Sequence, residues 1–216
     1  MHTLEEREST ILEYIIRDYI RTVDPVSSER VSRRGHLDLS PATIRNAMAE
    51  LDEEGYLEQP HTSGGRIPTD KAYRYFVDNL FSIHTPGVRM TVEIDQQTVR
   101  KMAKRLKMFV AVFDDDEEVI SAGIDEVFDE PEFKEYAIAR AFAEILENID
   151  DLAGIYAEKA RMRPRVYIGS EHPFKSGAYF GSIFFKDENS DSVIVSLGPK
   201  RMNYERALTI MRQIYE

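Results

Sequence analysis

The sequence predicts an α+β protein with two domains, a winged helix-turn-helix at the N-terminus and an α+β sheet domain after it. A short capped helix followed by a Gly-Gly hairpin, over residues 38–69, predicts the first domain. Five segments rich in β-branched and aromatic residues, interspersed with helical patterns after residue 95, predict the second. Pro86-Gly87 interrupts the helical pattern between them. We therefore expect domains at 1–81 and 95–216, joined by a linker over 82–94.

Two helices are expected before the capped one. Thr3 begins a capping box that Glu6 closes, and an apolar stripe follows it. The stripe consists of Ile11, Leu12, Ile15, Ile16 and Tyr19. Ser27 is placed to cap a second, short helix over 28–34. Three helices with a short connection before the third follow a helix-turn-helix plan.

The third helix has the features of a DNA-reading helix. Ser40 and Pro41 suit its N-cap and first helical position, and Gly55 suits a left-handed stop. The periodicity turns Ile44, Ala47, Met48 and Leu51 inward and leaves Ala42, Arg45, Asn46 and Ala49 outside. Arg45 can pair with guanine and Asn46 with adenine in the major groove, and small neighbours allow a close approach. A solvated amphipathic helix has the same pattern and stays open as the alternative.

A hairpin is expected after this helix. Segments 56–62 and 66–68 flank Ser63-Gly64-Gly65, whose glycines allow the positive backbone angles of a tight turn. We expect Arg66 near the tip of this wing, because a narrow and negative minor groove favours an arginine. His61 is placed to contact phosphate. A structural hairpin with a solvated Arg66 is one alternative, and a winged domain converted to protein interaction is another.

The charge balance is acidic, with 28 Lys and Arg against 39 Asp and Glu and a net charge of −11. This total argues against a generic nucleic-acid binder. The basic residues between Arg30 and Arg74 nevertheless predict one cationic face, from which Glu5, Glu6, Glu8 and Glu13 point away.

The cations outside the third helix are expected to contact phosphates rather than bases. A surface ion pair is the alternative for each, for example Lys71 or Arg74 with Asp70 or Asp78. The expected DNA-binding residues are Arg33, Arg34, Ser40, Ala42, Thr43, Arg45, Asn46, Ala49, His61, Thr62, Arg66, Lys71 and Arg74.

Further elements are predicted from Thr69 onward. Thr69 is placed to cap a helix with Tyr73, Phe76, Val77 and Leu80 turned inward. The remaining predicted elements are a helix over 96–107, strands over 108–113 and 119–124, a long helical region over 131–161, strands over 165–169, 178–186 and 192–197, and a closing helix over 203–215 with Ala207, Ile210, Met211 and Ile214 inward.

Nothing in the sequence predicts an enzyme. The chain has no cysteine, and its five histidines are scattered without metal-ligand spacing. The acidic run 114–118 lacks the spacing of a calcium loop and is interpreted as a solvated turn. No Walker or dinucleotide-binding glycine motif occurs. We expect no catalytic residue, cofactor or metal, and, without a signal peptide or a long apolar run, a soluble cytoplasmic protein.

The run from Leu39 to Asp78 closely resembles the HrcA heat-inducible transcription repressors. The shared sequences are Leu-Ser-Pro-Ala-Thr-Ile-Arg-Asn, Leu-Glu-Gln-Pro-His-Thr-Ser and Gly-Arg-Ile-Pro-Thr-Asp-Lys. Three motifs of the family's C-terminal domain are matched over 128–133, 166–174 and 198–206. The chain is shorter than the family pattern between Leu80 and about Gly123. The family carries there the first part of a GAF-like domain and an inserted dimerisation segment.

The resemblance implies a GAF-like second domain and a homodimeric repressor that binds double-stranded DNA at an inverted-repeat operator ahead of chaperone genes. It also implies dependence on a GroE-type chaperonin. The shortened region leaves the dimer interface and the operator spacing open. A regulator controlled by a small molecule is the alternative function, with Tyr167, Tyr179, Phe180 and Phe184 lining a pocket. Packing of these aromatic residues in a core is the competing interpretation.

Overall fold

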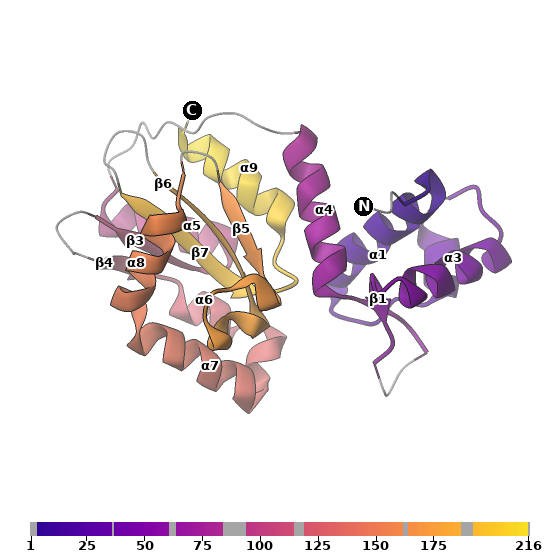
Figure 1. The fold of residues 1–216 in the computed structure, drawn as a ribbon, viewed down its shortest axis with the longest axis horizontal. Helices are drawn as coiled ribbons and strands as arrows, with labels where there is room; N and C mark the ends of the chain where they lie inside the picture. The colour runs from indigo at the N-terminus through magenta and orange to yellow at the C-terminus, as the bar shows by residue number, and fades with distance from the viewer. Residues whose placement is uncertain are drawn as a thin grey trace. The chain divides into compact units, whose positions relative to one another are not determined.

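A computed structural model of the chain describes residues 4–35, 37–60, 64–83, 94–114, 119–161, 164–186 and 192–215. The chain divides into two compact units, Met1–Leu80 and Phe81–Glu216, called here the N-terminal and the C-terminal unit (Figure 1). Most of the predicted linker, residues 84–93, lies outside the described residues. No helix in the described ranges combines the length and apolar character needed to cross a bilayer.

In its described residues the N-terminal unit contains helices and a two-stranded antiparallel sheet. The elements are α1 (Glu6–Thr22), α2 (Ser28–Arg34), α3 (Pro41–Glu53), β1 (Leu57–Glu58), β2 (Ile67–Pro68) and α4 (Asp70–Ile83). α1 packs against α2, α3 and β2. The predicted stripe of α1 is buried at Ile11, Leu12, Ile15 and Ile16, and the predicted inward residues of α4 are buried as well. Each large aliphatic side chain buried in this way contributes roughly 1.5 to 3 kcal/mol.

The start of α1 differs from the prediction. The N-cap is Glu5 rather than Thr3, and the Glu8 carboxylate accepts a hydrogen bond of 3.0 Å from the Glu5 backbone N–H. Glu8 therefore satisfies an amide that the helix itself leaves without a partner. Glu8 is also buried, whereas Glu5 and Glu6 are exposed. Thr3 lies outside the described residues.

The C-terminal unit is built on a five-stranded antiparallel sheet in the order β4-β3-β7-β6-β5. The strands are β3 (Phe109–Phe113), β4 (Val119–Ala122), β5 (Arg165–Ile168), β6 (Phe180–Lys186) and β7 (Val193–Pro199). Each lies within two residues of a predicted strand at both ends. The α+β prediction is therefore confirmed for this unit.

Helices cover both faces of this sheet (Figure 1). They are α5 (Gln96–Leu106), α6 (Ile124–Phe128), α7 (Tyr136–Glu147), α8 (Ile149–Lys159) and α9 (Tyr204–Tyr215), with short 3-10 turns at η1 (Pro131–Lys134), η2 (Gly169–Glu171) and η3 (Lys175–Tyr179). Phe109, Ala111 and Phe113 of β3 pack in a cluster with residues of α6, α7 and α8. On the other face α5 contacts β3 and β4, and α9 contacts α5. β3 is consequently buried at every position, which a strand with one solvated face would not be.

The helical region predicted over 131–161 is divided among η1, α7 and α8, and the backbone leaves the helical conformation between α7 and α8 at Asn148 (φ −115°, ψ 29°). One strand end differs from the prediction. The strand predicted to reach Ile124 stops at Ala122. Gly123 has φ +92°, and a Cβ there would lie 2.2 Å from the Met108 carbonyl oxygen. Only glycine fits this corner, after which α6 begins.

Arg201 joins two of the three C-terminal motifs. Its guanidinium donates to the carboxylate of Glu130, which precedes η1, at 2.5 Å. It also donates to the carboxylate of Glu132, within η1, at 2.8 Å for one Nη–Oε pair. Burial disfavours the charged arginine, but the bonds and charges of the two glutamates outweigh burial and raise the pKa of Arg201. Segments 128–133 and 198–206, far apart in sequence, are thereby held together by a partly buried bidentate ion pair.

Candidate nucleic-acid interface

α3 begins with a complete N-cap. The Ser40 hydroxyl accepts a hydrogen bond of 3.1 Å from the Thr43 backbone N–H, and the two hydroxyls lie 2.8 Å apart. Pro41 occupies the first turn, where its missing N–H has no intrahelical partner to lose. The start of the helix is fixed as the sequence predicts. Ser40 and Thr43 are engaged with each other at this cap.

The outer face of α3 is small and polar. Ile44, Ala47, Met48 and Leu51 are buried against the unit. On the other side Ala42, Arg45, Asn46 and Ala49 are exposed, and this division matches the prediction. The exposed face therefore carries a guanidinium and an amide between two alanines. No bulky side chain on it prevents close approach to the edges of base pairs.

α3 ends among acidic residues. Asp52, Glu53 and Glu54 lie at its C-terminus, where negative charge opposes the helix dipole. The backbone leaves the helix at Gly55, whose φ of +75° is left-handed, as predicted. The Tyr56 N–H then donates to the Leu51 carbonyl at 2.8 Å and closes the last turn.

Two cations offset these charges. Arg66 Nε donates to Asp52 Oδ2 at 2.7 Å. Lys71 Nζ donates to the Glu54 carbonyl oxygen at 2.6 Å and lies 3.9 Å from the centre of the Tyr56 ring. Both side chains, predicted to contact DNA, thus brace the end of α3.

Arg66 immediately precedes β2, on the loop side of the β1–β2 pairs, and exchanges two backbone hydrogen bonds of 2.9 Å with Val26. Its backbone is therefore held against the loop after α1, and its place near the tip of a wing stays a prediction. Residues 61–63 lie outside the described residues, and with them the predicted contacts His61 and Thr62.

The hairpin itself is present, with Leu57 opposite Pro68 and Glu58 opposite Ile67. The prediction that its glycines supply positive backbone angles for a tight turn is wrong, because neither Gly64 nor Gly65 adopts a positive φ. A Cβ on Gly65 would instead lie 2.8 Å from the Pro25 carbonyl carbon. Gly65 is therefore required by the close approach of the hairpin to the loop after α1.

The remaining basic residues fall into two groups. Arg30 pairs with Asp18 at 2.6 Å, and Arg74 pairs with Asp78 at 3.2 Å, which is the ion-pair alternative considered for Arg74. Arg33, Arg34 and Arg45 are exposed, although Arg33 lies 4.0 Å from Glu29. Lys71 is exposed as well, so the exposed cations of the predicted face lie on the last turn of α2, the outer face of α3 and the first turn of α4.

Two contacts that hold the helices of this unit together were not predicted from the sequence. Asp18 is only 4% exposed and contacts both Arg21 (2.6 Å) and Arg30, which fastens α1 to α2. Its position on the apolar stripe of α1 was the available signal. The Thr69 hydroxyl, considered only as a cap for α4, also donates to the Gly55 carbonyl at 2.7 Å and so ties α4 to the end of α3.

The aromatic residues considered for a ligand pocket belong mainly to the core. Phe180 and Phe184 are fully buried, and the half-buried Tyr167 packs on Phe184 with 4.9 Å between ring centres. Tyr179 is 43% exposed. The packing interpretation of Phe180 and Phe184 is confirmed.

Comparison with known families decides the relationship of the chain. A family model described as the HrcA protein C terminal domain matches residues 76–208, more than half of the sequence. The chain belongs to the HrcA family. The match includes the β3–β7 sheet and both motifs joined by Arg201.

Several HrcA relatives match shorter stretches of the chain. The heat-inducible transcription repressor HrcA of Geobacter sulfurreducens is 52% identical over 101 residues, which are 47% of this chain and 28% of the relative. The repressor of the same name from Acetivibrio thermocellus is 61% identical over 77 residues, 36% of this chain and 22% of the relative. That of Shouchella clausii is 42% identical over 118 residues, which are 55% of this chain and 33% of the relative. The matched parts thus span about a third or less of each relative.

A solved structure titled "Crystal structure of a hypothetical protein at 2.2 A resolution" has the same fold. Its TM-score is 0.80 at 19% sequence identity, and the alignment covers 98% of this chain and 95% of that one. At this identity the similarity concerns the fold alone.

Proposed function

We propose that this HrcA-family chain is a sequence-specific DNA-binding transcription repressor. In this proposal the N-terminal unit is a winged helix-turn-helix, with α3 as the reading helix and the β1–β2 hairpin as the wing. The observation that carries it is the exposed outer face of α3, where Arg45 and Asn46 stand between Ala42 and Ala49. The names of the HrcA relatives, heat-inducible transcription repressors, support the same function.

Each group of side chains has a distinct role in the proposal. Arg45 reads guanine and Asn46 reads adenine in the major groove, because these side chains form bidentate pairs with those bases. Arg33 and Arg34, exposed at the end of α2, bind phosphates and position the helix. Arg66, Lys71 and Arg74 contribute indirectly by stabilising α3 and α4, since their charged groups already have partners within the unit.

The regulatory part of the proposal concerns the C-terminal unit. We place it in the GAF-like class and assign dimerisation to it, so that two chains present two reading helices to an inverted-repeat operator ahead of heat-shock or chaperone genes. A GroE-type chaperonin is the proposed partner that keeps the repressor active. These assignments rest on family membership, and the cytoplasm is the expected site of action.

A binding titration tests the function. Full-length protein is titrated against a duplex carrying the inverted repeat expected for HrcA relatives and against a scrambled duplex, at two salt concentrations. We expect a preference of about 1,000-fold or more and an affinity that falls steeply with salt. Arg45→Ala and Asn46→Ala should each relax the preference at one base position. Unchanged preference in both variants would show that α3 is not the reading helix.

Equal, weak binding of the wild type to both duplexes would leave two explanations. Unbiased selection of binding sites from random duplexes separates them. Recovery of a different site would keep the repressor function and change its operator, whereas recovery of no site would contradict the function.

A further inference from the structure

α5 concentrates positive charge on one face of an otherwise acidic protein. Arg100, Lys101, Lys104 and Arg105 are all exposed, and the helix contains no acidic residue. Lys107, at the C-cap, is exposed as well. The inward side of α5 is apolar and buried, at Val99, Met102, Ala103 and Leu106. The outer face of α5 is therefore entirely polar and carries only positive charge.

This arrangement is unfavourable within the helix itself. Arg100 and Lys104, and likewise Lys101 and Arg105, are like charges four residues apart, which repel each other on a helix surface. The helix dipole favours the cations of the last turn but not Arg100 or Lys101 in the middle. Among the residues that the structure describes, neither Arg100 nor Lys104 forms an ion pair with a carboxylate. A polyanion on this face would relieve the repulsion.

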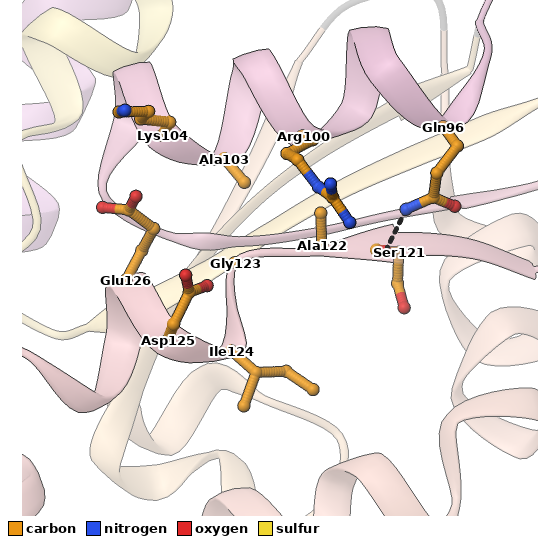
Figure 2. Close-up of a pocket in the computed structure, with 10 residues that line it drawn as sticks. All are labelled: Gln96, Arg100, Ala103, Lys104, Ser121, Ala122, Gly123, Ile124, Asp125 and Glu126. Carbon is orange, nitrogen blue, oxygen red and sulfur yellow. Dashed lines mark hydrogen bonds between the residues drawn. The ribbon is translucent and has the colours of Figure 1, made fainter.

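Cavities flank α5 on two sides. One of about 430 Å³ lies between α5, β4 and α6, and Figure 2 shows Gln96, Arg100 and Lys104 on its α5 side and the carboxylates of Asp125 and Glu126 on its α6 side. Gln96 Nε2 donates to the Ser121 carbonyl oxygen of β4 at 2.9 Å, so this wall is held in place. Another of about 400 Å³ is lined by Arg105 together with Asn203, which precedes α9, and Glu205 and Arg206 of α9. The cationic ridge of α5 therefore stands between two depressions, open to an extended partner.

We propose that the outer face of α5 is a second DNA-backbone contact, in which Arg100, Lys101 and Lys104 bind phosphates of duplex DNA without reading its sequence. The inference rests on the proposed DNA-binding function. Arg100 to Lys107 extends about 10 Å along the helix, the axial length over which one DNA strand presents about three phosphates.

The chemistry of this face favours DNA over other anionic partners. Protein–protein interfaces are depleted in lysine and need an apolar centre, and α5 exposes no apolar side chain. A membrane-surface helix would need its apolar side for the lipid, but here that side is buried in the core. Interfaces with DNA are polar and strongly cationic, as this face is.

The test compares two triple variants of the full chain with the same change in net charge. One is Arg100→Gln, Lys101→Gln, Lys104→Gln on α5. The control is Lys134→Gln, Arg140→Gln, Lys175→Gln, whose residues are exposed on η1, α7 and η3. Each protein is titrated at several salt concentrations against the inverted-repeat duplex and a scrambled duplex, after circular dichroism has shown unchanged folding.

We expect the α5 variant to bind both duplexes about ten-fold or more weakly, with a slope of log affinity on log salt that is shallower by about 2 to 3. The ratio between the two duplexes should stay the same, and the control should bind like the wild type. Equal effects of both variants, or no effect of the α5 variant, would overturn the inference. An α5 variant that binds DNA normally but changes its sedimentation behaviour would assign the face to an acidic protein surface instead.

The two duplexes also separate this inference from the proposed function. A wild type without sequence preference, whose salt-dependent binding is nevertheless lost in the α5 variant, would contradict the repressor function and retain the α5 contact. If the wild type strongly prefers the inverted repeat and the α5 variant binds it with the same preference and full affinity, the repressor function is supported and the α5 contact is contradicted.

Discussion

Arg45 and Arg66 are arginines of the same unit in different surroundings. Arg45 is exposed on the outer face of α3, whereas the Arg66 side chain is 22% exposed and donates to Asp52 at 2.7 Å. Arg66→Gln should lower the free energy of unfolding by about 1 kcal/mol, since it removes a charge-assisted bond at a helix end, and should leave operator preference unchanged. Arg45→Gln should change stability by less than about 0.5 kcal/mol and relax the preference. Urea unfolding and the DNA titration measure both quantities.

The reverse pattern would reassign the two residues. If Arg66→Gln kept full stability but bound DNA poorly, the Asp52 pair would not be a structural contact, and Arg66 would return to the set of DNA ligands. This comparison decides between the two interpretations of Arg66 that the sequence left open.

The buried Tyr156 should make the stability of the C-terminal unit depend on pH in the alkaline range. It is 3% exposed, its hydroxyl donates to Ser182 at 3.3 Å, and burial raises its pKa well above the usual 10.0. Tyr156→Phe should be less stable by about 1 kcal/mol near neutral pH, because Ser182 loses a partner.

That difference should shrink as the pH rises above about 10. Tyr156 then ionises in the unfolded chain but stays protonated in the folded one, so the wild type loses up to about 1.4 kcal/mol per pH unit from this residue and Tyr156→Phe does not. Urea unfolding from about pH 7 to pH 11 measures the difference. The control is Tyr136→Phe, because Tyr136 is 78% exposed; its stability relative to the wild type should not change with pH in this range. A Tyr156→Phe penalty that stayed constant with pH would mean that Tyr156 ionises alike in both states.

At the scale of elements, the hairpin depends on one of its two glycines. A Cβ at Gly65 would meet the backbone of Pro25 at 2.8 Å, whereas nothing lies within 4 Å of a Cβ at Gly64. Gly65→Ala should therefore lower the free energy of unfolding by about 1 to 3 kcal/mol, as overpacking against backbone does, and Gly64→Ala should change it by less than about 0.5 kcal/mol. Thermal or urea unfolding of the two variants measures this. Equal effects would show that the glycines matter for turn geometry rather than for packing.

The ends of helices were predicted well where residues close in sequence determine them. The caps at Ser27 and Ser40 and the stop at Gly55 appear where side-chain and backbone chemistry require them. The errors lie where a tertiary contact decides. The corner at Gly123 depends on the Met108 carbonyl, and the Arg66 side chain pairs with Asp52, 14 residues away. Helical periodicity cannot show such partners.

At the scale of the whole molecule, exposed cations and acids are concentrated on different helices. The net charge of −11 coexists with exposed cations on α2, α3 and α5. The acids Glu144, Glu147, Asp150, Asp151 and Glu158 lie on α7 and α8, on the other face of the sheet from α5. In the proposed complex, the net charge repels DNA at long range and these cations attract it locally. We infer that binding depends on specific contacts and is weak on unrelated sequences.

A repressor of an inverted repeat must also supply two reading helices, while each chain contributes one α3. We therefore predict that two chains bind one full operator duplex. Deleting one half-site should weaken binding by about 100-fold or more, because the second chain then loses its specific contacts and the first loses the effective concentration that dimerisation provides. Sedimentation of protein–duplex mixtures gives the stoichiometry, and titration of the half-site duplex gives the loss, with a full-length duplex whose second half is scrambled as control. One chain per duplex, with equal affinity for half and full sites, would show that this short HrcA-family chain acts as a monomer, and would remove dimerisation from the role proposed for its C-terminal unit.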